Sequence, residues 1–217
     1  AVKDLTDRIA EAYPPAAPIF AQMLADYPAL EGCAGDLERA FRVLMMCFKA
    51  GGTLFVCGNG GSMADALHIT AELEKSFRLP RALTEEQRRR FLDLPFGEAL
   101  ASSLQQGLRA IPLGTNLSLA SATANDNPLR DIGFAQELYA LARPGDVLLG
   151  ISTSGKAQNV RYAAATARAL GMTVIALTGL DGGPLVQEVD IAIRAPGRDT
   201  PEAQGWHIQL YHVLCDI

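Results

Sequence analysis

The chain has 217 residues, of which 49% are hydrophobic and 20% charged, with a formal net charge of −5 at pH 7. These values are typical of a soluble globular protein large enough for one domain with a substantial core. The acidic balance argues against nucleic-acid binding, which favours a basic face. No apolar run approaches the ~20 residues that span a bilayer, and the four cysteines lack C-x-x-C spacing. We therefore expect a cytoplasmic protein with no nucleic-acid or membrane partner.

Helical patterns come first in the chain, over residues 4–50, and are interrupted at Pro14 and Pro15. From residue 53 onward, short apolar runs alternate with helical patterns. The predicted strands are 53–57, 109–113, 146–151, 173–177 and 190–195. The predicted helices among and after them are 63–77, 117–124, 131–142, 157–170 and 202–215. This alternation indicates an α/β fold, with a parallel sheet flanked by helices on both faces.

Residues 79–108 are too long for a simple connection, and the stretches 83–94 and 97–108 are helical in composition. They predict an inserted helical arm. The run of arginines at 88–90 follows Glu85 and Glu86, which favours a solvated helix face over a nucleic-acid site. We predict a single domain over residues 1–217, with an N-terminal helical segment at 1–50 and the insertion at 79–108.

Two loops that join a strand to a helix are candidates for phosphate binding. The first, at 58–62, contains three glycines and Ser62. Glycine lets the backbone approach a ligand, and free amides at a helix start favour an anion. A tight turn without a ligand explains this loop equally well. The second loop places Ser152, Thr153 and Ser154 before Gly155, and three neutral donors with a glycine favour an anion site over a simple cap. Both loops are expected at the carboxyl ends of parallel strands, where ligands collect.

All three histidines lie in two stretches that can be assembled into one metal site. His68 and Glu72 are four residues apart on a predicted helix and share a face, so they can bind one ion or simply hydrogen bond to each other. Gln204 and His212 are eight apart, which is ~12 Å of rise along an unbroken helix. They can share an ion only if Gln204 lies before or at an irregular helix start. The spacing alone does not choose between His207 and His212.

These motifs resemble the sugar isomerase (SIS) domain and, within it, the phosphoheptose isomerases, which convert sedoheptulose 7-phosphate to a heptose 7-phosphate. The resemblance runs in order from about residue 36 to the end. The matching positions outside the glycine-rich loop include Asp65, His68, Glu72, Asn125, Asp126, Ser152, Thr153, Ser154, Gly155, Gln204 and His212. The resemblance implies a flavodoxin-like fold of three layers.

The resemblance also implies the composition of the active site. It implies one Zn²⁺ per subunit, held by His68, Glu72, Gln204 and His212, and an enediol mechanism in which Glu72 is the candidate base and His212 the candidate acid. It implies a homotetramer whose active sites use more than one subunit, with a sugar phosphate as substrate. The substrate-binding residues expected from the loops and the resemblance are Asn59, Gly60, Gly61, Ser62, Asn125, Asp126, Ser152, Thr153, Ser154, Lys156 and Gln204.

The sequence departs from the family pattern near the second loop, where Lys156 and Ala157 stand in place of the common Asn-Ser. One phosphate hydroxyl is lost, and Lys156 can replace it with charge. Ser76 stands where an arginine is common. The function expected is therefore a metal-dependent isomerase of a seven-carbon sugar phosphate that feeds surface-polysaccharide heptose synthesis. The alternatives are an isomerase of another ketose phosphate and a non-catalytic SIS protein that binds a partner or a regulatory sugar phosphate.

Overall fold

The computed structural model describes residues 2–217, and within them lies a parallel sheet of five strands. The strands are β1 (Leu54–Gly58), β2 (Ala110–Pro112), β3 (Val147–Ile151), β4 (Thr173–Thr178) and β5 (Ile191–Arg194). Their order in the sheet is β2-β1-β3-β4-β5, the flavodoxin-like order. The five strands predicted from the sequence are confirmed, with ends that differ by at most one residue.

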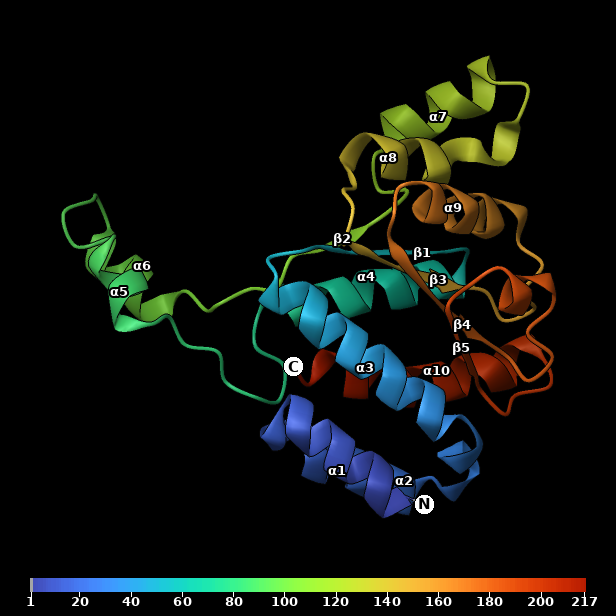
Figure 1. The fold of residues 1–217 in the computed structure, drawn as a ribbon. Coiled ribbons are helices and arrows are strands. Elements are labelled where there is room, and N and C mark those ends of the chain that lie inside the picture. The colour runs from blue at the N-terminus through green and yellow to red at the C-terminus, as the bar shows by residue number, and fades with distance from the viewer. Residues whose placement is uncertain (1) are drawn as a thin grey trace.

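Helices cover both faces of the sheet, so the α/β fold of three layers is confirmed (Figure 1). The helices of one face are α3 (Ala34–Lys49), α4 (Gly61–Glu74) and α10 (Thr200–Cys215), with α1 (Val2–Ala12) and α2 (Ala17–Asp26) packed outside them. The helices of the other face are α7 (Leu117–Asp126), α8 (Gly133–Leu141) and α9 (Gln158–Ala169). The described residues also contain four short 3-10 helices, at 14–16, 28–33, 130–132 and 184–187.

The central strands are buried on both faces because side chains alternate along a strand. In β1, Leu54 and Val56 belong to the core under α3, α4 and α10, whereas Phe55 and Cys57 belong to the core under α8 and α9. Each of these four side chains is at most 1% exposed. A continuous apolar run of five residues is therefore a strand here and not half of an amphipathic helix.

The predicted insertion carries α5 (Glu85–Arg89) and α6 (Gly97–Ser103), which extend away from the sheet (Figure 1). The prediction of a helix over 97–108 was wrong after residue 103. Residues 104–108 return along the outgoing chain, where Ala82 and Gln105 form an antiparallel bridge. The amide of Leu108 donates to the carbonyl of Leu73, so the backbone hydrogen bonds that a helix would make are made elsewhere.

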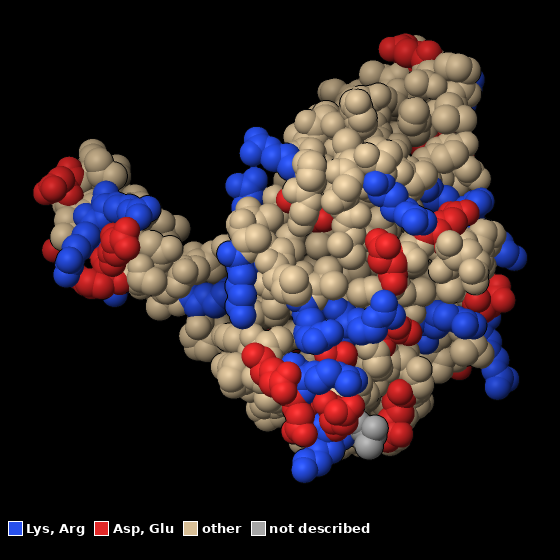
Figure 2. All heavy atoms as spheres, in the orientation of Figure 1, with Lys and Arg blue, Asp and Glu red and all other residues tan. Residues whose placement is uncertain are grey.

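Arg88, Arg89 and Arg90 are exposed, and Arg89 and Arg90 form ion pairs with the glutamates one helical turn earlier, which confirms the solvated helix face. Arg89 lies 3.3 Å from Glu85, and Arg90 lies 2.6 Å from Glu86. Figure 2 shows both signs of charge interspersed on the arm and on the N-terminal helices. None of the helices in residues 2–217 is long and apolar enough to cross a membrane.

Candidate functional site

The two predicted loops lie side by side at the carboxyl edge of the sheet. Gly58, the last residue of β1, is paired in register with Ile151, the last residue of β3. The chain passes from β1 to β2 on one side and reaches β3 on the other, so the strand order reverses between β1 and β3. Open α/β sheets bind ligands at such a switch point.

Asn59 and Asn159 join the first loop to the start of α9. Each side-chain amide donates to the other's carbonyl oxygen at 2.8 Å. Asn59 is exposed and Ser62 is buried. Gly60, with φ of 56°, occupies the left-handed region that favours glycine, which allows the sharp entry into α4. Asn159 was not singled out from the sequence, because nothing local distinguishes it from an ordinary helix residue.

The second loop presents its hydroxyls beside the start of α10. Ser152 is buried, Thr153 is half-buried and Ser154 is exposed. The hydroxyls of Thr153 and Thr200 lie 3.1 Å apart, and the backbone amide of Lys156 donates to the hydroxyl of Ser154. Lys156 itself is exposed. The hydroxyls and the lysine provide donors and positive charge suited to an anion.

Helices α4 and α10 run parallel, side by side, from this edge of the sheet. Gly61 at the start of α4 lies against the side-chain amide of Gln204, which would have to shift to admit a Cβ at position 61. About two turns further along both helices, His68 contacts Tyr211, and beyond them the thiol of Cys215 faces the carbonyl of Ile69. The parallel helices therefore separate two groups of predicted residues, with Gln204 near the loops and the histidine pair further along.

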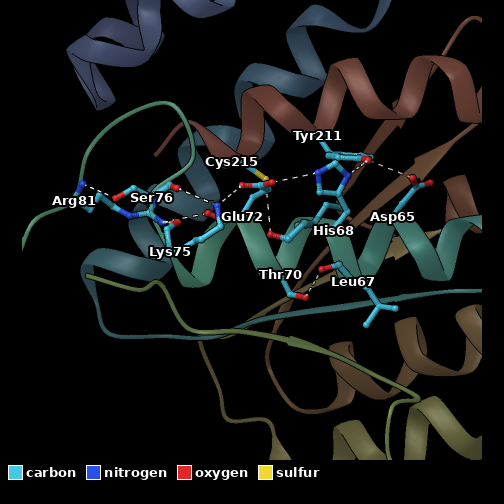
Figure 3. Close-up of polar contacts among 11 residues, drawn as sticks. Asp65, Leu67, His68, Thr70, Glu72, Lys75, Ser76, Arg81, Tyr211 and Cys215 are labelled. Atoms are coloured by element: carbon cyan, nitrogen blue, oxygen red, sulfur yellow. Dashed lines mark hydrogen bonds and ion pairs between the residues drawn. The ribbon is translucent and has the colours of Figure 1, made fainter. Parts of the chain in front are cut away.

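Glu72 connects His68 to Lys75 along α4 (Figure 3). Its Oε1 lies 3.3 Å from Nε2 of His68, and its Oε2 lies 3.3 Å from the ammonium of Lys75. The Glu72 side chain is 15% exposed, so the carboxylate is largely shielded and yet reachable. The predicted placement of His68 and Glu72 on one helix face is confirmed.

His212 lies beside His68, with ring centroids 5.3 Å apart, and its other side contacts Phe77. Its Nε2 is buried and has no hydrogen-bond partner in residues 2–217. Burial lowers the pKa of His212, and the nearby His68 and Arg78 act in the same direction, whereas Glu72 opposes them. A neutral imidazole is the form that binds metals.

The residues present fit a metal ion in their chemistry, although they are not assembled around one point. Two imidazoles and a carboxylate are zinc ligands, and an unpartnered buried nitrogen on His212 is available for an ion. Among residues 2–217, no group of three His, Cys, Asp or Glu side chains converges as a metal site. Within one chain, His68, Glu72 and His212 lie together and Gln204 lies apart.

The condition for Gln204 and His212 to share an ion within one chain, an irregular helix start at Gln204, is not met. Helix α10 begins at Thr200, where the Asp199 side chain accepts from the amide of Glu202 and Pro201 fits the first turn. Gln204 is therefore inside a continuous helix, and ~12 Å of rise separates it from His212. One copy of the chain cannot bring both side chains to one ion in this conformation.

His207 is a core residue, as expected for the histidine that is not a ligand. It is 0% exposed, and its Nε2 lies 3.1 Å from the carbonyl oxygen of Thr178 at the end of β4. Burial lowers the pKa of His207, and the hydrogen bond to Thr178 partly opposes this effect. The neutral ring thus donates its Nε2 hydrogen to the sheet, away from His68.

The structure does not bring Asn125 and Asp126 to the two loops. Both side chains are exposed at the end of α7, and the Asn125 amide donates to Asp126 at 2.8 Å. Helix α7 lies over α8, on the far side of α8 from the sheet (Figure 1). Their assignment to substrate binding remains a prediction from the resemblance.

Tyr211 contacts the site, although the sequence did not predict a function for it. Its hydroxyl lies 2.9 Å from Nδ1 of His68 and 3.4 Å from a carboxylate oxygen of Asp65 (Figure 3). Burial raises the pKa of Asp65, against which the Tyr211 hydrogen bond and the His68 charge act. The only signal in the sequence was that Asp65, His68 and Glu72 follow one another on a single helix face.

The arrangement of two loops at the switch point of a five-stranded parallel sheet is that of the SIS domain. Residues 27–87 and 99–179 match the SIS domain family. The unmatched residues 88–98 lie inside the arm. A structure of phosphoheptose isomerase from Neisseria gonorrhoeae superposes with a TM-score of 0.69 at 33% identity, over 92% of this chain and 95% of that one.

Similarity to individual proteins identifies one enzyme family among the SIS-domain proteins. The phosphoheptose isomerase of Rhodospirillum rubrum is 37% identical over 199 residues, covering 91% of this chain and 93% of that protein. That of Trichlorobacter lovleyi is 39% identical over 204 residues, covering 91% of both. The chain therefore belongs to the phosphoheptose isomerases, an enzyme family within the SIS-domain proteins.

Proposed function

We propose that this chain is a metal-dependent aldose–ketose isomerase that converts sedoheptulose 7-phosphate to D-glycero-D-manno-heptose 7-phosphate. The observation that carries the proposal is the pairing of phosphate-type loops with a His68, Glu72 and His212 cluster along α4 and α10. The choice of a heptose phosphate as the substrate rests on the relatives named phosphoheptose isomerase.

The phosphate of the substrate binds at the second loop. Ser152, Thr153 and Ser154 donate from their hydroxyls, and Lys156 contributes charge in place of a missing hydroxyl. Ser62 assists from the first loop, where the amides at the start of α4 favour an anion. Asn59 and Gln204 lie at the same edge and contact the sugar.

The proton moves between C1 and C2 through an enediol, so a base must serve the carbon and an acid the oxygen. Glu72 takes the carbon proton, and His212 serves the oxygen on the opposite side. The Glu72 oxygen next to His68 is the one placed to bind a metal, which leaves the oxygen next to Lys75 for the proton. His68, Glu72, Gln204 and His212 would hold a zinc ion, and its Lewis acidity would polarise the substrate carbonyl and stabilise negative charge on the carbonyl oxygen.

In the proposed assembly, another subunit would supply Gln204 to the metal site. Gln204 and His212 are too far apart on one helix to bind the same ion. In a homotetramer with sites between subunits, all four proposed ligands could meet at one ion. In such an assembly the loops and Gln204 of one subunit face the His68, Glu72 and His212 cluster of another.

Mixed assemblies test this sharing. Glu72→Gln and Gln204→Ala are each expected to be inactive alone. When the two chains are co-expressed with different tags and the mixed oligomers are purified, some sites combine two intact halves, and activity should return to about one quarter of wild type. Activity no higher than that of the parent variants would show that each site is built within one chain.

The function itself is tested by offering purified protein a panel of ketose phosphates and following the aldose product. Turnover of sedoheptulose 7-phosphate well above that of five- and six-carbon ketose phosphates supports the proposal. A preference for a shorter sugar would be consistent with an isomerase but would contradict sedoheptulose 7-phosphate as its substrate.

A further inference from the structure

The Tyr211 side chain connects α10 to two residues of α4. Its ring is 1% exposed, and it meets the His68 ring edge-on with centroids 5.5 Å apart. Its hydroxyl lies between Nδ1 of His68, at 2.9 Å, and Oδ1 of Asp65, at 3.4 Å. Figure 3 shows the three side chains in line, with Glu72 on the other side of the imidazole.

Counting donors fixes the direction of these hydrogen bonds. A tyrosine hydroxyl has one hydrogen to donate, and a carboxylate can only accept. To hydrogen bond with both partners at once, the hydroxyl of Tyr211 must donate to Asp65 and accept from Nδ1 of His68. The hydrogen of the His68 ring is then on Nδ1, and the lone pair is on Nε2.

This tautomer directs a lone pair at Glu72. Nε2 of His68 and Oε1 of Glu72 are 3.3 Å apart, so two electron-rich atoms face each other. Such a pair is stable when a cation lies with it, and imidazole nitrogen with carboxylate oxygen is a zinc-type pair. Metal-binding histidines commonly have the other ring nitrogen fixed by a neighbouring acceptor.

We propose that Tyr211 is a positioning residue, which, held by Asp65, fixes the tautomer and orientation of His68 so that Nε2 is presented for metal binding. The inference rests on the proposed role of His68 as a ligand. It assigns a function to Asp65 and Tyr211, which touch neither the metal nor the sugar in the proposed mechanism.

The test removes the hydroxyl and keeps the ring, because Tyr211 also packs edge-on against His212, with centroids 5.2 Å apart. In Tyr211→Phe, Nδ1 of His68 loses its hydrogen-bond acceptor. The tautomer with the hydrogen on Nε2 then becomes favoured, because Nε2 can donate to Glu72. Nitrogen-15 NMR of the metal-free protein reports this tautomer directly, since the chain has only three histidines. Zinc affinity, measured by competition with a chromogenic chelator, should fall about 10- to 100-fold.

Two further variants make the result specific. Tyr139→Phe removes the hydroxyl of an exposed tyrosine on α8 and should leave the His68 signals and the zinc affinity unchanged. In Asp65→Asn, an amide can donate to the Tyr211 hydroxyl, which then donates to Nδ1 of His68 and reverses the chain of hydrogen bonds. This variant should show the same tautomer change as Tyr211→Phe.

Wild-type tautomer and zinc affinity in Tyr211→Phe would overturn the inference. If wild-type protein binds no zinc, the proposed metal site fails, and the spectra of the metal-free protein still decide whether Tyr211 sets the His68 tautomer. A tautomer change with a matching loss of affinity supports both the positioning role and the site.

Discussion

Replacing Glu72 by Gln should lower kcat by about 10²–10⁴-fold, the usual contribution of a general base. Glutamine keeps the size of the side chain but cannot accept a carbon proton. The side chain is 15% exposed and makes its close polar contacts with His68 and Lys75, so the fold and the oligomer should persist. Steady-state kinetics with sedoheptulose 7-phosphate provides the measurement.

The matched control is Glu74→Gln, two residues further along α4 at an exposed position, which should retain wild-type kcat. Zinc content separates the two proposed roles of Glu72. If the variant loses turnover but retains zinc, Glu72 acts as the base. If it loses both turnover and zinc, Glu72 acts as a metal ligand. A kcat close to wild type would remove Glu72 from the mechanism.

Replacing Ser152 and Ser154 together by alanine should raise KM for the phosphorylated sugar. A hydrogen bond to a charged group contributes about 1.5–3 kcal/mol, and 1.4 kcal/mol is about tenfold in binding. Two lost hydroxyls should therefore raise KM by about 10²-fold or more. The change in kcat should be smaller, because the phosphate lies away from the reacting carbons.

The control for this variant is Ser102→Ala with Ser103→Ala, two exposed serines at the end of α6 in the arm. It should leave KM as in wild type. Unchanged KM in the Ser152 and Ser154 variant would show that the phosphate binds elsewhere.

The strands and loops were predictable because their signals are local. A short apolar run between turn residues, followed by glycines or hydroxyls and a helical pattern, predicts one strand-to-helix unit by itself. The parallel sheet then places both loops at one edge, as the register of Gly58 with Ile151 confirms. The arrangement of His68 and Glu72 needed only the helical repeat.

Other features depended on contacts between distant segments. The sequence pattern continued a helix through residues 104–108, whereas Leu108 hydrogen bonds to Leu73 and Gln105 pairs with Ala82. The Asp199 cap makes α10 regular from its start, which places Gln204 inside the helix. The contact of Tyr211 with Asp65 joins residues 146 positions apart, and no spacing rule reports it.

The most direct test of metal-dependent heptose-phosphate isomerisation is one assay in three states of the protein. Turnover of sedoheptulose 7-phosphate is measured as isolated, after removal of metal by a chelator, and after return of zinc, with folding checked by circular dichroism. We expect activity to be lost on chelation and recovered with zinc. Activity that is unaffected by complete metal removal, in folded protein, would contradict the proposed site.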